Sequence, residues 1–158
     1  MLKGIILISL VFIILITIGS TINIVRRIKI DKKIEYLVDE ANPISSTNFN
    51  EFKQRIHSTI RTSVYNVPGV YILYNKNNSK YYIGQSKTMI YRVTNHFKGK
   101  GSPDVYKSYI NGDKFIIRMI PLENSGFKNL NDFERYTIRK FKAYKYGYNK
   151  TRGNKNYK

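Results

Sequence analysis

Two tyrosines close to glycines are the residues of this chain whose types and spacing first suggest chemistry. Tyr71 follows Gly69-Val70, and after ten further residues Tyr82 precedes Ile83-Gly84. A phenol hydroxyl can donate or accept a hydrogen bond, and with a lowered pKa it can act as a base. Because glycine has no Cβ, a ligand or another backbone can approach closely beside each tyrosine. The tyrosine pair is therefore a candidate reactive site.

Further polar residues follow at spacings that suit the same site. Arg92 and His96 are four residues apart, so on a helix their side chains lie on one face. A guanidinium is suited to bidentate contact with a phosphate. Glu134 offers hard oxygen ligands for one Mg²⁺ or Mn²⁺, when waters and a substrate phosphate complete the coordination. The alternative for Glu134 is a helix-capping carboxylate without chemistry, because Asn131 lies three residues before it.

This set of residues is similar to the signature of a known family. The pattern Gly69-Val70-Tyr71 to Tyr82-Ile83-Gly84, followed by Arg92, His96, Glu134 and Asn149, resembles that of the GIY-YIG nucleases, with valine in place of the usual isoleucine. The resemblance covers residues 66–151 and leaves the first 65 unexplained. It implies a GIY-YIG-like fold and a metal-dependent endonuclease, a hydrolase that cuts the phosphodiester bonds of DNA.

The resemblance also implies roles for single residues. Arg92 would contact the scissile phosphate and Glu134 would hold one Mg²⁺ or Mn²⁺. Tyr71 would activate water, although His96 and a metal-bound hydroxide are alternatives for the base. Asn149 would brace the site, unless it is only a turn residue after Gly147. The expected catalytic residues are Tyr71, Tyr82, Arg92, His96 and Glu134; the supporting residues are Gly69, Gly84, Ser86 and Asn149; and the nucleic-acid-binding residues are Lys87, Lys98 and Lys100.

Composition points to a polyanionic partner. The chain has 158 residues and a formal net charge of +18, and residues 66–158 alone hold 19 basic against 5 acidic residues. Such an excess favours nucleic acid first and an anionic membrane surface second, the alternative being an ordinary solvated surface. The absence of cysteine excludes disulfides and thiolate zinc sites. No motif indicates sequence-specific recognition, so we expect DNA binding with little sequence preference and no small-molecule cofactor.

An apolar run near the amino terminus predicts a membrane anchor. Residues 4–25 carry no charge, and as a helix they would span about 33 Å, enough for a hydrocarbon core of about 30 Å. A cleaved signal peptide is the alternative, since small residues follow at 19–21. The basic residues after the run predict one pass through the cytoplasmic membrane, with the carboxyl-terminal domain in the cytoplasm. These basic residues are Arg26, Arg27, Lys29, Lys32 and Lys33.

Hydrophobic periodicity predicts the elements that position the site. We expect an α+β fold: a small three-stranded antiparallel sheet flanked by helices and preceded by one transmembrane helix. The expected strands are residues 70–75, 80–85 and 114–122, and the expected helices are 28–41, 52–64, 88–97, 105–111 and 131–143. The expected domains are a transmembrane anchor with a basic flank (1–27), a helical stalk (28–65), the nuclease-like domain (66–151) and a basic tail (152–158), with the chain from 144 onward folding back over the site.

Two functions remain open on the sequence. The first is a membrane-anchored, divalent-metal-dependent endonuclease that acts on incoming phage or plasmid DNA. The second is a catalytically inactive basic module that tethers DNA or anionic lipid to the membrane. Binding alone does not need Glu134 in a basic site, which favours the enzyme. The sequence does not decide between defence, DNA uptake, repair and mobility, and it does not indicate the oligomeric state.

Overall fold

The structure is a computed structural model, and it describes residues 2–55 and 66–154. The chain forms two compact units, Met1–Lys33 and Ile34–Lys158. The division falls within the first helix, α1 (Leu2–Glu40), so the last turns of that helix belong to the second unit. Ile34 and Val38 in these turns are buried.

The first unit consists of the apolar part of α1. By length and composition this helix is able to cross a membrane: within Leu10–Glu40 the most apolar window has a mean hydropathy of 1.7 and is 0% buried. Its large apolar side chains from Leu10 to Val25 are 45–64% exposed. A signal sequence near the amino terminus passes the same test of length and composition. The helix continues without a break to Glu40, in agreement with the helix expected over residues 28–41.

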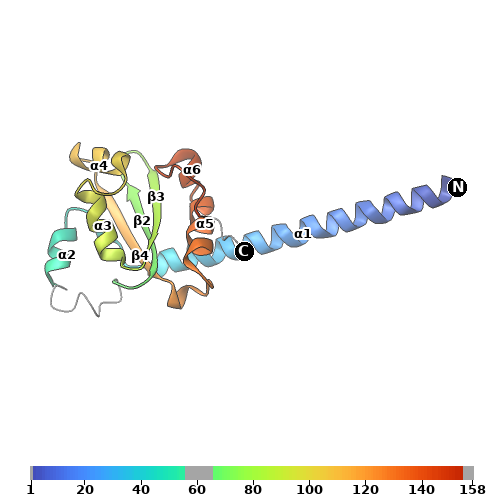
Figure 1. Cartoon of the computed structure of the whole chain (residues 1–158), viewed down its shortest axis with the longest axis horizontal. Helices are drawn as coiled ribbons and strands as arrows, with labels where there is room; N and C mark the ends of the chain where they lie inside the picture. The colour runs from blue at the N-terminus through green and yellow to red at the C-terminus, as the bar shows by residue number, and fades with distance from the viewer. Residues whose placement is uncertain (1, 56–65, 155–158) are drawn as a thin grey trace. The chain divides into compact units, whose positions relative to one another are not determined.

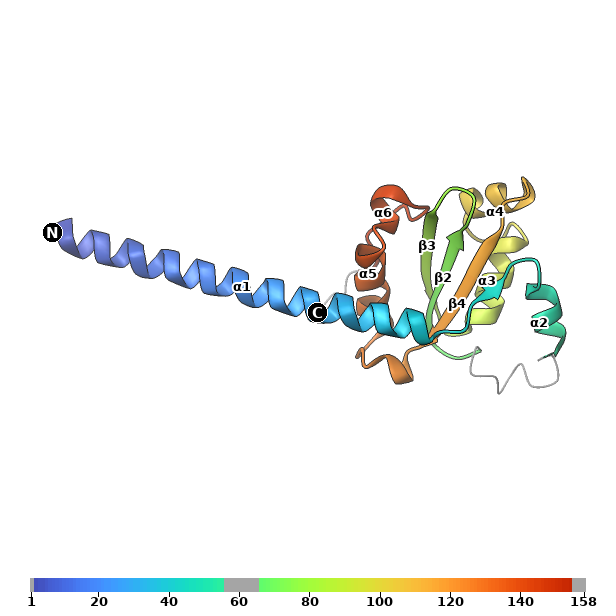
Figure 2. The ribbon, with the colours of Figure 1, turned by 180° about the vertical axis from the view of Figure 1, so that it is seen from behind.

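The second unit is an α+β domain built on an antiparallel sheet. The strand order is β1-β4-β2-β3. The helices α2, α3 and α4 lie against one face of the sheet, and α5 and α6 lie on the other (Figures 1 and 2). The strands are β1 (Ile44–Ser45), β2 (Gly69–Asn75), β3 (Lys80–Ser86) and β4 (Phe115–Pro121); the helices are α2 (Phe49–Arg55), α3 (Met89–Phe97), α4 (Pro103–Ile110), α5 (Leu130–Lys140) and α6 (Ala143–Tyr146), with a short 3₁₀ helix, η2 (Glu123–Ser125).

The sheet has one strand more than the three that the sequence predicts. The additional strand, β1, lies in a segment expected to be a loop, and it pairs Ile44 with Ile117 of β4. Beyond it the backbone N–H of Ser46 donates to the carbonyl of Phe115 at 2.8 Å, and the Ser46 hydroxyl accepts the N–H of Phe115 at 2.9 Å. A strand of two residues is too short to show an alternating pattern, so pattern reasoning misses it.

The predicted hairpin is confirmed, with β2 and β3 paired from Gly69–Ser86 to Asn75–Lys80. The predicted helix over 52–64 is observed as α2, which begins earlier, and residues 56–65 lie outside the described part of the chain. The helix predicted over 131–143 begins at Leu130 and ends at Lys140. It ends there because Lys142 has a left-handed backbone with φ 51°, and a new short helix starts at Ala143.

The register of the hairpin decides which residues meet. Strand residues that pair across a ladder point to the same face, so Tyr71 lies opposite Gly84, and Tyr82 lies opposite Leu73 on the same face. The central strand β2 is buried on both faces, whereas β3 is an edge strand with several half-buried side chains. The core on the Tyr71 face includes Leu73, Val93, Phe115 and Ile117. Tyr71 is thus fixed in the core, and Tyr82 lies at the edge of the sheet.

Candidate active site

Tyr71 is held under the second glycine of the motif. Its side chain is 1% exposed. A Cβ placed on Gly84 would overlap the Tyr71 hydroxyl and ring, so a larger residue at that position would displace the phenol. The glycine of Tyr82-Ile83-Gly84 is therefore needed because the Tyr71 hydroxyl occupies the space where a side chain would begin.

His96 of α3 fixes the direction of the hydrogen bonds in this cluster. The imidazole is fully buried, and its Nδ1 accepts the backbone N–H of Ser102 at 2.9 Å. Because Nδ1 accepts, the ring proton of the neutral imidazole lies on Nε2. Nε2 is 2.9 Å from the Tyr71 hydroxyl and therefore donates to it. Gly101 leaves room for the ring, since a Cβ at this position would overlap the imidazole.

Tyr82 and Arg92 extend the cluster towards solvent. The Tyr71 and Tyr82 rings are stacked with their centroids 6.3 Å apart, and the guanidinium of Arg92 is near enough to lower the pKa of both tyrosines. Since Tyr71 accepts from His96, its own proton is available to Tyr82. The bonds therefore run in one direction, from Ser102 to His96 and from His96 to Tyr71. Tyr82 is half-buried and Arg92 is exposed, so these two side chains form the part of the cluster that solvent can reach.

Burial keeps the ring groups of this cluster neutral at pH 7. Desolvation, followed by the neighbouring Tyr82, raises the pKa of Tyr71 well above its ordinary value, although Arg92 opposes the shift. Burial likewise raises the pKa of Tyr82, again against the effect of Arg92. Burial lowers the pKa of His96 to about 4. Arg92 thus lowers the pKa of both tyrosines, but desolvation raises it by more.

Glu134 of α5 reaches the end of β3, where Gln85 binds it. The Gln85 amide nitrogen donates to the Glu134 carboxylate at 3.1 Å and to Asn131 Oδ1 at 2.7 Å. The backbone N–H groups of Gln85 and Asn154 also donate to this carboxylate. Burial raises the pKa of Glu134, and these hydrogen bonds oppose the rise. The tail thus folds back over α5 as far as Asn154, and residues 155–158 lie outside the described part of the chain.

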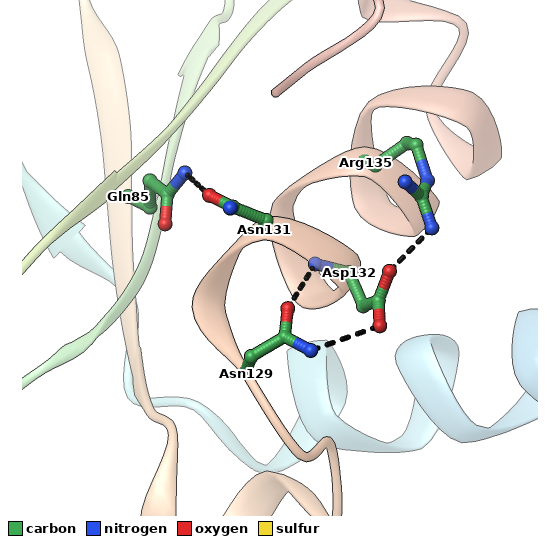
Figure 3. Close-up of polar contacts among 5 residues, drawn as sticks. All are labelled: Gln85, Asn129, Asn131, Asp132 and Arg135. Atoms are coloured by element: carbon green, nitrogen blue, oxygen red, sulfur yellow. Dashed lines mark hydrogen bonds and ion pairs between the residues drawn. The ribbon is translucent and has the colours of Figure 1, made fainter. Parts of the chain in front are cut away.

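The capping alternative for Glu134 is wrong. Because α5 begins at Leu130, its cap is Asn129, whose Oδ1 accepts the N–H of Asp132 at 2.9 Å. The Asn129 amide in turn donates to Asp132 at 3.0 Å, and Arg135 pairs with the same carboxylate (Figure 3). Asn131 lies within the helix and faces Gln85 (Figure 3). The carboxylate of Glu134 is therefore not used as a cap.

The side-chain amide of Asn149 is hydrogen-bonded to β3 through both its oxygen and its nitrogen. Its Oδ1 accepts the N–H of Ile83 at 2.9 Å, and its Nδ2 donates to the carbonyl of Ile83 at 2.7 Å. Ile83 is the residue between Tyr82 and Gly84. This is the contact that a bracing role requires, and a turn residue does not need it. Gly69, at the other end of the hairpin, packs against the backbone of Ile120 and the Met89 side chain.

The family assignment follows from this arrangement together with the sequence match. Residues 67–149 match the family model described as the GIY-YIG catalytic domain. The chain belongs to the GIY-YIG family. Searches of curated proteins and of solved structures returned no significant match. Membership implies a nuclease domain with DNA as its substrate, and GIY-YIG nucleases generally use divalent metals.

The remaining expected residues of the GIY-YIG domain lie around α3. The Ser86 hydroxyl donates to the carbonyl of Thr88 at 3.0 Å and accepts its N–H at 3.0 Å, so Ser86 forms a local turn before α3. The three lysines expected to bind nucleic acid, Lys87, Lys98 and Lys100, are exposed. The sequence reasoning does not include Gln85, although its place directly after Tyr82-Ile83-Gly84 is a signal that could have found it.

The carboxylate of Glu134 in this GIY-YIG domain fits a cation that takes a single oxygen ligand from the protein. Among residues 2–55 and 66–154, no group of three or more His, Cys, Asp or Glu side chains could hold a metal ion. A carboxylate has about four acceptor positions, and three N–H donors approach that of Glu134. A hard cation with several water ligands, such as Mg²⁺, requires no more from the protein than one such oxygen.

We expect His96 to reduce stability at acidic pH. The folded protein holds His96 neutral with a pKa of about 4, whereas in the unfolded chain its pKa is near the ordinary value of 6.5. Between these values the unfolded state binds the extra proton, so the free energy of unfolding falls as pH is lowered from about 6.5 to about 4. Urea unfolding of the full chain in detergent, followed by the near-ultraviolet circular dichroism of its tyrosines, measures this slope.

The variant His96→Gln is the comparison that assigns the effect. It keeps a polar side chain but has no group that titrates in this range, so its unfolding free energy should depend less on pH. Contributions from groups that the parent and the variant share cancel in the difference between the two slopes. Equal slopes for the parent and the variant would show that His96 is not held neutral by burial.

Proposed function

We propose that this chain is a membrane-anchored, divalent-metal-dependent DNA endonuclease that hydrolyses phosphodiester bonds with little sequence specificity. The observation that carries the proposal is the ordered pair of hydrogen bonds from Ser102 to His96 and from His96 to Tyr71, with Tyr82 and Arg92 beside them and Arg92 lowering the pKa of both phenols. Glu134 is close enough to influence the pKa of both tyrosines. A module that only binds DNA has no need for buried polar groups in a fixed order.

Arg92 is the proposed contact for the scissile phosphate. Arg92 is exposed, and it is near enough to the tyrosine pair to lower the pKa of both phenols. A planar fork fits two phosphate oxygens at once and stabilises the negative charge that develops on them. Lys87, Lys98 and Lys100 would attract the flanking phosphates without regard to sequence, and such binding weakens with salt.

Tyr82 is the proposed contact for the attacking water, and Tyr71 positions it. Tyr71 is almost fully buried, so its hydroxyl has little access to solvent. Tyr82 is half-buried, and hydrogen bonding by Tyr71 and Arg92 opposes the rise of its pKa that burial causes. These two groups therefore raise the fraction of Tyr82 that is ionised, and this phenolate is the form that can take a proton from the attacking water. Tyr71 and His96 would act indirectly, because their hydrogen bond keeps the Tyr71 hydroxyl in a fixed position beside Tyr82.

Glu134 is the proposed metal ligand, with Gln85 as the residue that orients it. A bound Mg²⁺ or Mn²⁺ would act as a Lewis acid that stabilises charge on the phosphate and the leaving oxygen. Gln85 donates to Glu134 at 3.1 Å while Asn131 accepts from the same amide at 2.7 Å, which fixes the rotamer of Gln85. Outer groups of this kind hold the ligand oxygen in one direction.

The apolar part of α1 is the proposed anchor, with the domain on the cytoplasmic side. This helix is long and apolar enough to span, and the basic residues that follow it favour the cytoplasmic side. A nuclease held at this surface would meet DNA as it enters the cell. Restriction of incoming phage or plasmid DNA is the role that we propose from this position.

Replacing Glu134 with Gln should abolish DNA nicking while leaving DNA binding intact or slightly tighter. The amide loses the charge that holds the metal, and one negative charge fewer on a basic domain does not weaken phosphate attraction. Nicking of supercoiled plasmid, with and without Mg²⁺, and a binding assay without metal measure the two effects. Glu123→Gln is the matched control. Glu123 is exposed in η2, so this variant should leave nicking unchanged.

Nicking by Glu134→Gln at the parental rate would contradict the assignment of Glu134 as the metal ligand. A parental protein that binds DNA but never nicks it would be the inactive tethering module.

The two phenols should respond differently to substitution by Phe. Tyr82→Phe removes the proposed water contact, and nicking should be lost at every pH. Tyr71→Phe removes a donor that lowers the pKa of Tyr82, so nicking should fall at neutral pH and recover in part at higher pH. The measurement is the initial nicking rate from about pH 6.5 to 9.5, with Tyr36→Phe on exposed α1 as the control. Loss in Tyr71→Phe without recovery, together with retained activity in Tyr82→Phe, would assign the base to Tyr71.

The anchor is tested by fractionation and by protease protection of spheroplasts. The full chain should sediment with membranes, and external protease should leave its carboxyl-terminal domain intact. A chain lacking residues 1–27 should be soluble and should still nick DNA in vitro, because every proposed site residue lies after this segment. Digestion from outside would reverse the topology. Release of a shortened protein into the medium would identify the apolar run as a signal peptide.

A further inference from the structure

A pocket unrelated to the motif residues opens between α2, α3 and α4. Its volume is about 110 Å³. Phe49 and Lys53 of α2 line it together with Phe97 and Lys98 of α3 and Tyr109 of α4. The pocket therefore combines aromatic rings and lysines, and no residue of the proposed catalytic cluster lines it.

Aromatic rings form one wall of this pocket. The Phe97 and Tyr109 rings are 4.6 Å apart between centroids, and Phe49 meets Phe97 edge-on at 6.0 Å. Phe49 is 3% exposed, so the wall is fixed by the core, while Phe97 and Tyr109 remain half-buried. A planar ring can stack against such a surface, whichever hydrogen-bonding groups it carries.

Two lysines bring positive charge to the same pocket. Lys53 lies with its Nζ 5.4 Å from the Phe49 ring centroid, and partial burial and then the Lys98 ammonium lower the pKa of Lys53. In the part of the chain that the structure describes, neither lysine forms an ion pair with a carboxylate. Two ammonium groups that repel one another attract an anion between them. A phosphate monoester, with a charge between −1.5 and −2 near pH 7, matches two lysines.

The pocket lies on the other flank of α3 from the catalytic side chains. Successive residues of a helix are rotated by about 100°, so His96 lies about 40° from Arg92 around the axis. By the same count Phe97 and Lys98 lie about 140° and 240° from Arg92. A helix with its side chains is about 10 Å across, which a few nucleotides of a single strand can span. The two flanks are therefore separate sites within reach of one DNA strand.

We propose that this pocket binds a nucleoside monophosphate unit, with the base against Phe97 and Tyr109 and the phosphate between Lys53 and Lys98. Two sources present this chemistry: a free nucleotide, and the 5′-phosphorylated end of a DNA strand. The DNA source rests on the proposed endonuclease function, whereas the free nucleotide does not. In either case the ligand is recognised by its terminal phosphate together with one base.

Isothermal titration of the full chain in detergent, with EDTA in place of metal, tests the proposal. The ligands are deoxyadenosine monophosphate, deoxyadenosine, inorganic phosphate, and a hexanucleotide with either a 5′ phosphate or a 5′ hydroxyl. The nucleotide or the phosphorylated hexanucleotide should bind at least about tenfold more tightly than deoxyadenosine or phosphate alone. Deoxyadenosine fills only the base position of the site, and inorganic phosphate fills only the phosphate position. Tight binding of the free nucleotide identifies that source. A preference for the 5′ phosphate on the hexanucleotide, without tight binding of the free nucleotide, identifies the DNA end.

Two pocket variants and one matched control complete the test. Lys53→Gln and Tyr109→Leu should each weaken the tighter ligand about tenfold or more, and Lys107→Gln, which removes the same charge from an exposed site on α4, should not. Near-ultraviolet circular dichroism of the tyrosines checks that each variant is folded. Equal weakening by Lys53→Gln and Lys107→Gln, or no preference for the nucleotide unit over its halves, would overturn the proposal. Because no metal or cleavage enters the measurement, its failure is distinguishable from failure of the endonuclease proposal.

Discussion

The hydrogen bond from His96 to Tyr71 is the interaction on which the rest of the site depends. Both side chains are buried, so an unsatisfied hydroxyl or ring nitrogen there would cost free energy. The Ser102 backbone sets the tautomer of His96, and two glycines leave the space that the rings occupy. Gly84 of the motif, the loop after α3 that contains Gly101 and Ser102, and the position of His96 on α3 all serve one buried pair of polar rings.

This burial also determines where charge resides. His96, Tyr71 and Tyr82 are all held neutral, each by desolvation. The charged groups next to the phenols are then Arg92, which is exposed, and Glu134, which is partly buried behind Gln85. A phosphate would meet the cation first, and a hard cation would meet the carboxylate. The fold therefore places one cationic and one anionic side chain beside neutral phenols before any ligand is bound.

The sequence predicted the hairpin and the residues of the motif well, because tyrosine, glycine and β-branched residues alternate locally there. It did not predict β1, since two residues carry no period, and it misplaced the cap of α5 by two residues. It also gave no indication that Asn154 reaches Glu134, that Ser102 sets the tautomer of His96, or that Lys53 lies near Lys98. Each of these depends on contacts between segments far apart in the chain, which a local pattern does not record. Nor does the sequence show that burial raises the pKa of both tyrosines, because depth of burial is likewise non-local.

The amide of Asn149 has a further consequence for how two copies of the chain can meet. An edge strand with free backbone groups is a template on which another chain can add a strand, and such pairing leads to aggregation. On β3 the N–H and carbonyl of Ile83 are taken by Asn149, and the carbonyl of Tyr81 is taken by the N–H of Tyr148 at 2.8 Å. This part of the β3 edge is thus closed to strand addition, so two copies that meet along it cannot join their sheets there.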